Sequence, residues 1–588
     1  MNIWKKNMSN ALFLWINHHQ LIDENNGEKK YLFDDCGINL SSKYDVQSKW
    51  NEEEKLLSIS INLSDANVLF EKNFYSRNIT DLKVIVGKNG VGKSSILRIL
   101  TEIASGNLLE SETKSLQYCL LWLRDNSTIQ YSTNLSLIPR FEVPINMRIE
   151  TGSLLGDVFS YSAVFNDEMI YGYPSGSYSH IHNLSTGYLI QQDVENFNNN
   201  IDMYGNKDRL FCHSIMDSIR QINFVSTFLK KGVFFDDIFH LPNGVTFSFS
   251  IGHIRNAIHS LLENVINVSE DSNSSKKIEN IWLDYYNNIK NLKLKIYFSL
   301  VLSEYRKYHR RPDQNDDITV EIDEFPDDGK CLKLSDIILN KYKLSLSYED
   351  VDNFYNSLCC AKNIANRYFY FDPINQNDEI TQLLKNISNY KSHTPIMEMF
   401  WNHLLSSGES SYLRLFSRLY DEILQIKRYH NKDSIEALFL IDEVDLYLHP
   451  EWQRGWFFKF IEGLNLMQRE IGVALKFHLI LTTHSPFMLT EFFDQNVVKL
   501  ERENGNKSCK VFSDKKNCFL AGNIYDILGN GFVQNGSIGK FVEHKLKNLL
   551  EKIGEKNYNL DDSDKFLFNN IGDSLMKAMF SQRLKDRL

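Results

Sequence analysis

Short apolar runs divided by polar stretches dominate the first hundred residues of the chain. Runs rich in aliphatic and β-branched side chains lie at residues 11–16, 56–63 and 82–86, and their length and composition predict β-strands. A glycine-containing loop follows the third run. Beyond it, apolar residues spaced three or four positions apart between Ser94 and Ile103 predict a helix with one buried face. The pattern therefore predicts a strand, a glycine loop and a helix in direct succession.

The polar middle of the chain, rich in Asn and Ser, has the character of an insertion, and regular patterning resumes near residue 400. The middle predicts strands at 117–123 and 158–165, and helices around 251–268, 278–308 and 379–389. The last part predicts a helix at 410–426, strands at 437–441 and 478–483, and a helix at 540–552. We find no repeat of fixed period and no sustained heptad pattern, which argues against solenoid and long coiled-coil architectures.

Composition places the chain of 588 residues among ordinary globular proteins, with 43% apolar and 24% charged residues. Such a length corresponds to several domains or to one large domain with insertions. The net charge of −10 repels nucleic acid overall, so any such contact needs a local basic patch. The eight cysteines lack CxxC spacing, which argues against a metal site. No apolar stretch approaches the ~20 residues of a bilayer span, so we expect a cytoplasmic protein without a membrane partner.

The glycine loop reads GKNGVGKS and fits the phosphate-loop pattern GxxxxGK[ST]. Its glycines let backbone N–H groups turn toward phosphate oxygens, and the helix N-terminus adds a favourable dipole. Lys93 is expected to place a positive charge at the β- and γ-phosphates of ATP, and Ser94 to ligate Mg²⁺. An ordinary glycine turn is the alternative, and the flanking strand and helix argue against it. The expected nucleotide contacts are Gly87, Asn89, Gly90, Gly92, Lys93, Ser94 and Ser95.

The apolar strand ALFLI delivers Asp442 and Glu443 at its carboxyl end, where open α/β sheets place their ligands. Asp442 is expected to hold Mg²⁺ through its water shell, and Glu443 to activate the water that attacks the terminal phosphate. An acidic pair after a strand is, by itself, equally compatible with a turn. The phosphate loop upstream favours the catalytic interpretation.

Two further segments belong to the same pattern. The strand HLILTT ends at His484, whose neutral imidazole can reach a γ-phosphate or its attacking water, although a single histidine at a strand end is more often structural. The segment LSSGE precedes a helix, so Ser406 and Gly408 offer a hydroxyl and backbone donors to an anion. A serine–glycine segment before a helix is also a common cap. The order of all four segments favours nucleotide binding.

In this order the four segments resemble the Walker A, signature, Walker B and switch-histidine motifs of the ABC-type ATPases. The resemblance implies an α/β fold: a P-loop ATPase head, with a mixed sheet flanked by helices, that carries a large and mainly helical insertion. In that superfamily the signature of one head closes on the nucleotide held by another, so Ser406 and Gly408 would act on a partner's ATP. The resemblance therefore implies an ATP-gated homodimer.

The finer resemblance is to stand-alone ATPases of the Rad50, RecF and OLD-like groups. VDLYLHPEWQ, after Glu443, resembles the acidic-leucine-histidine-proline run of the OLD-like group, and His449 stands where transporters carry the D-loop aspartate. WINHHQLI at 15–22, IVGKNGVGKSS, and AGNIYDILGNGF with NGSIGKF in 521–541 are together similar to the ATPase subunit PtuA of Septu and retron-linked antiphage systems. The resemblance also implies that Asn17 approaches the nucleotide.

The resemblance divides the chain into head, insertion and tail. The head comprises residues 1–170 and 396–525, the inserted region residues 171–395, and the tail residues 526–588. The Q-loop position stays open. Gln117 and Gln130 lie in suitable range, whereas the strand end near Ser162 and Asn166 corresponds better to the family's position.

A second activity is not expected in this chain. OLD-like proteins attach a metal-dependent nuclease, but the late DxD from Asp562 to Asp564 has no apolar strand before it and is interpreted as a solvated acidic loop. We therefore expect slow, regulatory ATP hydrolysis here and a separate HNH-type effector nuclease. The basic and aromatic segment 305–311 offers a contact for DNA or a retron's RNA–DNA, with a solvated helix end as the favoured alternative. The competing function is a Rad50- or RecF-like DNA-repair ATPase.

Overall fold

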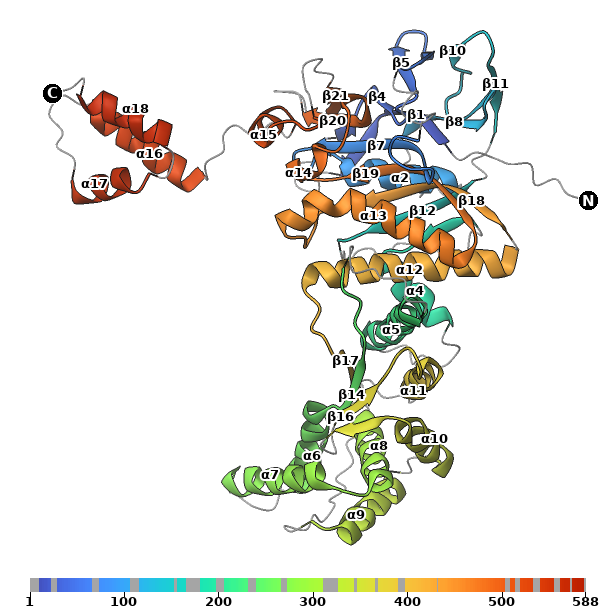
Figure 1. Ribbon diagram of the computed structural model, residues 1–588, viewed down its shortest axis with the longest axis vertical. Coiled ribbons are helices and arrows are strands. Elements are labelled where there is room, and N and C mark those ends of the chain that lie inside the picture. The colour runs from blue at the N-terminus through green and yellow to red at the C-terminus, as the bar shows by residue number, and fades with distance from the viewer. Residues whose placement is uncertain are drawn as a thin grey trace, which may run out of the picture.

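The computed structural model describes residues 10–22, 29–65, 73–105, 116–152, 156–164, 180–196, 206–230, 239–265, 272–309, 326–342, 346–364, 368–389, 397–430, 432–502, 508–512, 519–531, 540–554, 561–571 and 574–585. A sheet-containing head lies at one end of the long axis and a mainly helical insert at the other (Figure 1). In these residues no helix combines the length and the hydropathy that a membrane crossing requires.

The head is built on a nine-stranded sheet. Its strands, in spatial order, are β13 (Ile181–Asn183), β12 (Asp157–Ser162), β18 (Ser434–Asp442), β19 (Ala474–Thr482), β7 (Ile79–Gly87), β20 (Val497–Arg502), β21 (Cys509–Phe512), β3 (Lys29–Phe33) and β2 (His19–Ile22). The six strands from β13 to β20 run parallel to one another. Parallel strands buried on both faces need near-continuous apolar sequence, which explains the runs at β7, β18 and β19. Their carboxyl ends therefore meet at one edge of the sheet.

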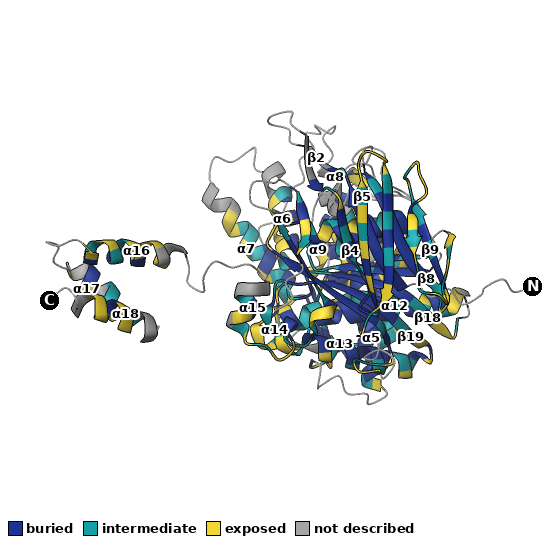
Figure 2. Cartoon of the chain, turned by 90° about the horizontal axis from the view of Figure 1, so that it is seen from above, coloured by how far each residue is buried: buried dark blue, intermediate teal, exposed yellow. Residues whose placement is uncertain are grey.

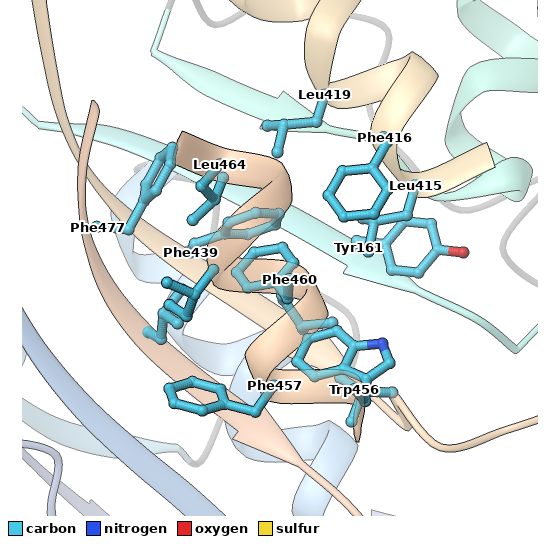
Figure 3. Close-up of a cluster of buried hydrophobic side chains, with 14 of the residues drawn as sticks. Tyr161, Leu415, Phe416, Leu419, Phe439, Trp456, Phe457, Phe460, Leu464 and Phe477 are labelled. Carbon is cyan, nitrogen blue, oxygen red and sulfur yellow. The ribbon is translucent and has the colours of Figure 1, made fainter. Parts of the chain in front are cut away.

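Helices cover both faces of this sheet. α2 (Lys93–Ser105) packs Ile96 and Leu100 into the core of one face, and α12 (Ser407–His430) and α13 (Pro450–Ile471) cover the other. In the second core, Phe460 of α13 packs against Phe416 of α12 and Phe439 of β18 (Figure 3). Each fully buried ring contributes roughly 1.5–3 kcal/mol of hydrophobic stabilisation. The motif-bearing strands are thus held by apolar layers above and below.

Two smaller sheets form the N-terminal lobe of the head. One has the order β11 (Arg148–Thr151), β9 (Thr128–Thr133), β8 (Gln117–Asp125), β1 (Asn10–Asn17) and β4 (Cys36–Asn39). The other has the order β10 (Arg140–Glu142), β6 (Leu56–Leu63) and β5 (Tyr44–Asn51). Alternating buried and partly exposed positions along β6 place one strand face on a separate core that includes Trp15 and Leu121. This lobe therefore has its own hydrophobic layer.

The insert has a separate core around a four-stranded sheet. The sheet order is β15 (Lys362–Ile364), β16 (Tyr368–Phe371), β14 (Val245–Phe249) and β17 (Met397–Trp401), and the helices are α6 (Ile251–Val265), α7 (Ser272–Asn288), α8 (Leu292–His309), α9 (Asp328–Lys341), α10 (Tyr348–Cys359) and α11 (Asn377–Asn389). Between insert and head lie α4 (Thr186–Asn196) and α5 (Asn206–Lys230), and α5 packs against both α12 and α11 (Figure 1).

The C-terminal part begins with short elements that stay on the head. These are α14 (Pro486–Leu489), the 3₁₀ turn η1 (Asp494–Asn496) and α15 (Ile524–Gly531). The remaining helices, α16 (Lys540–Gly554), α17 (Asp562–Asn569) and α18 (Ser574–Lys585), form a small unit apart from the head (Figure 1). Their few buried residues, such as Leu549 and Phe580, do not join the cores of the head (Figure 2).

The observed elements follow the apolar pattern closely, and the α/β head with a mainly helical insert is confirmed. The helix predicted over 278–308 is instead two helices, α7 and α8, because the asparagine-rich segment around Asn288 and Asn291 interrupts it; Asn291 accepts the N–H of Leu294 and starts the second helix. The head sheet extends past residue 171, since β13 pairs with β12, and β17 at the start of the second head segment pairs with β14 in the insert.

Candidate functional site

Three motif-bearing strands are direct neighbours in the head sheet. β19 lies between β18 and β7 and is parallel to both. Their last residues, Asp442, Thr482 and Gly87, therefore lie at the same edge. Open α/β sheets bind ligands outside the carboxyl ends of their strands. We call this group of strand ends, with the phosphate loop and the residues that follow β18 and β19, the nucleotide edge.

The phosphate loop has the backbone that its glycines permit. Gly87, Gly90 and Gly92 have φ values of 152°, 76° and 90°, where a β-carbon is disfavoured. A β-carbon on Gly92 would also lie 2.5 Å from Cζ of Phe33. Arg502, at the end of β20, donates to the carbonyl of Gly90 at 2.8 Å from outside the loop, a contact that the sequence did not suggest. The loop is thus built close against β3 and β20.

Lys93, the first residue of α2, folds back over the loop. Its Nζ donates to the carbonyl oxygens of Gly87 and Lys88, both at 3.2 Å. Burial lowers its pKa, while the nearby carboxylates of Glu443 and Asp442 act in the opposite direction. The side chain therefore holds a positive charge at the mouth of the loop, where a phosphate would compete for it.

Ser94 and Asp442 meet although the sequence separates them widely. The Ser94 hydroxyl donates to Oδ1 of Asp442 at 3.1 Å, and the Thr482 hydroxyl donates to the same oxygen at 2.5 Å. A hydroxyl and a carboxylate side by side match the oxygen ligands of Mg²⁺, which keeps several waters and takes the rest from phosphate. The residues present therefore fit a Mg²⁺ ion held by Ser94 and Asp442, the pair that the sequence predicts.

Glu443 has the conformation and setting of a strained, partly buried base. Its φ is 50°, in the left-handed region that a residue with a side chain rarely adopts. Its backbone N–H donates to the hydroxyl of Thr482 at 2.8 Å, which fixes the turn. Burial raises the pKa of the Glu443 carboxyl, and Asp442 and Asp445 raise it further against the lowering effect of Lys93. A raised pKa suits a group that accepts a proton during catalysis.

The sequence analysis missed three residues beside this site: Asp445, Thr482 at the end of β19, and Thr483 directly after it. The Asp445 carboxylate accepts the Thr483 hydroxyl at 2.7 Å and the backbone N–H of His484 at 3.1 and 3.2 Å. It thereby ties the turn after β18 to the turn after β19. Burial, followed by Lys93, lowers the pKa of His484, which favours the neutral imidazole. The signals were the third acid in the run from Asp442 to Asp445 and the paired threonines before His484.

The predicted signature lies at the start of α12. The hydroxyl and the backbone N–H of Ser406 both donate to the Glu409 carboxylate at 2.8 Å, and the Glu409 N–H donates back to the Ser406 hydroxyl at 3.2 Å. This is a capping box, so the cap interpretation holds for Ser406. Ser406 is nonetheless exposed, whereas Gly408 is buried, and a β-carbon there would lie 3.0 Å from Trp452. In the described residues, no hydrogen bond joins this segment to the phosphate loop of its own chain.

The side chain of Asn17 is hydrogen-bonded to other residues of the N-terminal half of the head. Its side chain is buried, donates to Gln117 at 3.0 Å and accepts the N–H of Asp35 at 3.0 Å. Gln117 is thereby engaged with Asn17, and Gln130 packs against Gly152 in the N-terminal lobe. Ser162, by contrast, pairs with Asp442 across β12 and β18. The end of β12 therefore lies beside the nucleotide edge, while Asn166 falls outside the described residues.

The other candidate segments are placed away from this edge. Tyr305 is fully buried and donates to the carbonyl of Ser260, so it offers no stacking surface to nucleic acid; the side chains of 306–311 lie outside the described residues.

Asp564 lies in α17, is buried and accepts Lys552 at 2.9 and 3.2 Å. The expectation of a solvated loop there is wrong, because a helix start buries the carboxylate. His449 caps α13, and no His, Cys, Asp and Glu group among the described residues could hold a metal ion unaided.

Comparisons with known proteins add to this geometry. Residues 214–490 match the model of an AAA domain family described as a putative AbiEii toxin of a type IV toxin–antitoxin system. The match includes Ser406, Asp442, Glu443 and His484, and the phosphate loop precedes it. No curated protein matches the sequence significantly.

Seventeen chains of solved structures match. One is from the structure of the recombination mediator protein RecF-ATPrS in the RecFOR pathway, with 10% identity and a TM-score of 0.20, covering 87% of this chain and 100% of that chain. Because this TM-score is low, the conclusion rests on the strand order, the nucleotide edge and the matched domain. Together they show that the chain has the α/β fold of a P-loop ATPase head of the ABC type.

Proposed function

We propose that this chain is the ATP-hydrolysing regulatory subunit of a bacterial antiphage defence complex, in which ATP-gated pairing of two heads controls a separate effector nuclease. The observation that carries the ATPase part is the Ser94–Asp442–Thr482 contact at the carboxyl ends of adjacent strands. The description of the matched family as a putative toxin of a type IV toxin–antitoxin system supports a role that involves a second protein.

The residues of the nucleotide edge have distinct roles in hydrolysis. Lys93 neutralises charge on the β- and γ-phosphates, and Mg²⁺ held by Ser94 and Asp442 would supply further charge neutralisation. Glu443 accepts a proton from the water that attacks the γ-phosphorus, while the bond to the bridging oxygen breaks and leaves ADP. The imidazole of His484 donates to the transferring phosphate, and Asp445 holds the backbone N–H of this residue.

The surface around Ser406 suits contact with a second copy of the chain, which would complete the nucleotide site. Ser406 is exposed, and the surrounding surface includes Leu404 and Tyr447, with 88% and 61% of their side chains exposed. Exposed apolar side chains beside a helix N-terminus favour a surface that another protein covers. The backbone carbonyl of Tyr447 also accepts the Ser407 hydroxyl at 3.3 Å, which joins this segment to the turn after β18. We infer that the phosphates of ATP bound to a second copy of the chain approach Ser406.

Mixing two inactive variants tests the shared site. Lys93→Ala removes the phosphate contact, and Ser406→Asp keeps a good helix cap while placing a negative charge against the γ-phosphate. Each variant alone should lose ATP turnover. An equal mixture should recover about one quarter of wild-type turnover, since half of randomly formed dimers are mixed and each carries one intact site. Absence of recovery, with mixed dimers shown by mass, would contradict sharing.

The regulatory part needs a separate experiment. Purified chain with ATP and Mg²⁺ should leave DNA intact, and coexpression with neighbouring gene products should yield a complex containing a nuclease. Cleavage of DNA by the purified chain alone would overturn the division of labour. ATP-dependent, salt-sensitive DNA binding without such a partner would instead favour the Rad50- or RecF-like alternative.

A further inference from the structure

Buried charged side chains meet where α4, α5 and α12 pack together. They come from three helices, and all are shielded from solvent. We call them the charged hub: Asp193, His213, Asp217, Arg220 and Arg418. Burying charges costs several kcal/mol per ion unless each is paired and hydrogen-bonded, so the arrangement of partners is informative.

Arg418, on the helix that follows the signature, is the centre of the hub. Its Nε and Nη2 donate to the two carboxylate oxygens of Asp217 at 2.7 and 3.0 Å, a bidentate pair. Its Nη1 donates to the carbonyl of Leu184 and to the hydroxyl of Thr186, both at 3.0 Å. One guanidinium thus joins three elements: α12, α5 and the connection from β13 to α4. Lysine could not reproduce this planar fork.

The rest of the hub completes the charge balance. Asp193 of α4 accepts Nδ1 of His213 at 2.7 Å and both terminal nitrogens of Arg220. Burial by itself raises the pKa of Asp217, but the ion pair with Arg418 outweighs it and lowers that pKa to about 2. Each guanidinium therefore has a buried carboxylate partner, and Arg220 has a further one in Asp421, 3.5 Å from its Nε.

On one side the hub reaches the nucleotide edge. The N–H of Leu184, whose carbonyl Arg418 holds, donates to Ser160 of β12 at 2.8 Å. The next residue, Ser185, accepts the N–H of Ser162 at 2.9 Å through its hydroxyl. Ser162 is the residue that pairs with Asp442, and the N–H of Ala163, just after β12, donates to the Asp442 carbonyl at 3.4 Å. A chain of hydrogen bonds therefore joins Arg418 to the backbone beside Asp442.

On the other side the hub reaches the insert. Asp217 also accepts Gln221 of α5 at 3.2 Å, and Gln221 in turn accepts the indole N–H of Trp401 at 3.3 Å. Trp401 ends β17, the insert strand that leads into the signature segment. Two residues further along α5, Asn223 accepts a hydrogen bond from the side-chain amide of Asn377 of α11 at 3.3 Å. The same helix therefore contacts the sheet and a helix of the insert.

We propose that Arg418 is a positioning residue that couples the insert to ATP turnover, so that a ligand or protein bound by the insert alters the rate of hydrolysis through α5. The inference rests on the proposed ATPase function and adds its regulation. A cluster that only stabilised the head would need no hydrogen-bonded connection to β17 and α11. The charged hub has a hydrogen-bonded connection on each side: one leads toward Asp442 and the other toward Trp401.

Full-length variants separate coupling from folding. Arg418→Gln removes the central guanidinium, and Arg418→Lys keeps the charge without the planar fork. Gln221→Ala removes the amide that joins Asp217 to Trp401. Arg428→Gln, on the exposed face of the same helix, is the matched control. ATP turnover is measured for each variant, together with hydrogen exchange in α11 and β14–β17 with and without a non-hydrolysable ATP analogue.

The expected result is a pattern across these variants. Arg418→Gln should lower kcat by about tenfold or more with KM changed by less than about twofold, Arg418→Lys should recover part of it, and Arg428→Gln should match wild type. Gln221→Ala should retain turnover but lose the nucleotide-dependent change of exchange in the insert, a readout that remains even if Arg418→Gln does not fold.

Two outcomes would overturn the proposal. One is wild-type chain that binds and hydrolyses ATP while exchange in the insert stays the same with and without analogue. The other is Gln221→Ala with an unchanged exchange response. A wild-type chain that binds no ATP analogue would overturn the proposed function first and this inference with it.

Discussion

The head contains two polar clusters of opposite construction, the nucleotide edge and the charged hub. At the edge, Glu443 is strained, half-buried and surrounded by other carboxylates, so its pKa is raised. In the hub, Asp217 is more deeply buried, yet its pKa falls to about 2 because Arg418 holds both oxygens. Burial raises both pKa values, and the partner decides the result. An under-paired group is available for chemistry, whereas a fully paired group fixes position.

The same contrast holds for the backbone. The nucleotide edge consists of turns that follow strands, where the left-handed conformations of Glu443 and Tyr447 store strain. The five charged residues of the hub lie within helices, and their ion pairs are made by side chains. Substitutions at the nucleotide edge should therefore change the rate of ATP turnover with little effect on the stability of the fold. Substitutions at the periphery of the charged hub should change the stability of the fold more than the rate of turnover.

The largest expected effect is on turnover at the edge. Glu443→Gln removes the proton acceptor, so kcat should fall by about 10²–10⁴-fold while ATP binding and the urea unfolding midpoint stay near wild type. Phosphate release and calorimetric binding measure the two separately. In the wild type, kcat should rise with pH through a Glu443 pKa that lies above its usual value. Glu53→Gln, on an exposed turn, is the control, and unchanged turnover in Glu443→Gln would refute the assigned base.

The next effect is on stability at the hub. Asp193→Asn removes the carboxylate that accepts both terminal nitrogens of Arg220 and leaves that buried guanidinium with Asp421, 3.5 Å from Nε. Breaking a buried pair costs about 3–5 kcal/mol. Urea unfolding should show this loss, whereas Asp433→Asn, at an exposed position, should be neutral. A loss of unfolding free energy below about 1 kcal/mol would mean that the hub contributes no more than an ordinary surface ion pair. The contrast between the charged hub and the nucleotide edge would then not hold.

A smaller effect concerns pH. His182 of β13 lies with Nδ1 2.8 Å from Glu422 and Nε2 3.6 Å from Asp157. Burial lowers its pKa, but these carboxylates outweigh burial and raise the pKa to about 8. The folded state thus prefers the protonated ring, so its stabilisation, about 2 kcal/mol, is complete below pH 6.5 and is lost as pH rises through about 8. Unfolding free energy measured across this window should fall in wild type and stay flat in His182→Gln.

The smallest effect distinguishes the cap from the phosphate contact at Ser406. Ser406→Ala should cost about 1 kcal/mol of stability because the capping box is lost. Ser406→Asp should keep the cap and the stability but lose turnover through repulsion of a partner's γ-phosphate. If Ser406→Asp turns over ATP normally, the residue is a cap alone.

What the sequence determined by itself was local: the apolar runs of β7, β18 and β19, the helix after the glycine loop, and the motifs at their ends. These follow from short-range periodicity and from the geometry that glycine permits. The break between α7 and α8 was missed, because a long amphipathic pattern hides a single capping asparagine. Asp445 was named only as part of a family run, since its role depends on a turn 39 residues away at His484.

Tertiary structure alone decided which distant residues meet. Ser94 and Asp442 are 348 positions apart, and Arg418 is 201 positions from Asp217. No periodicity encodes such distances; strand order and helix packing set them. The four-stranded sheet of the insert and the burial of Tyr305 were likewise invisible locally, because β14 and β17 lie far apart in the chain and only packing shows which face of α8 is covered. The motifs thus identified the residue types that carry the chemistry, and the parallel sheet brought those residues together at the carboxyl ends of its strands.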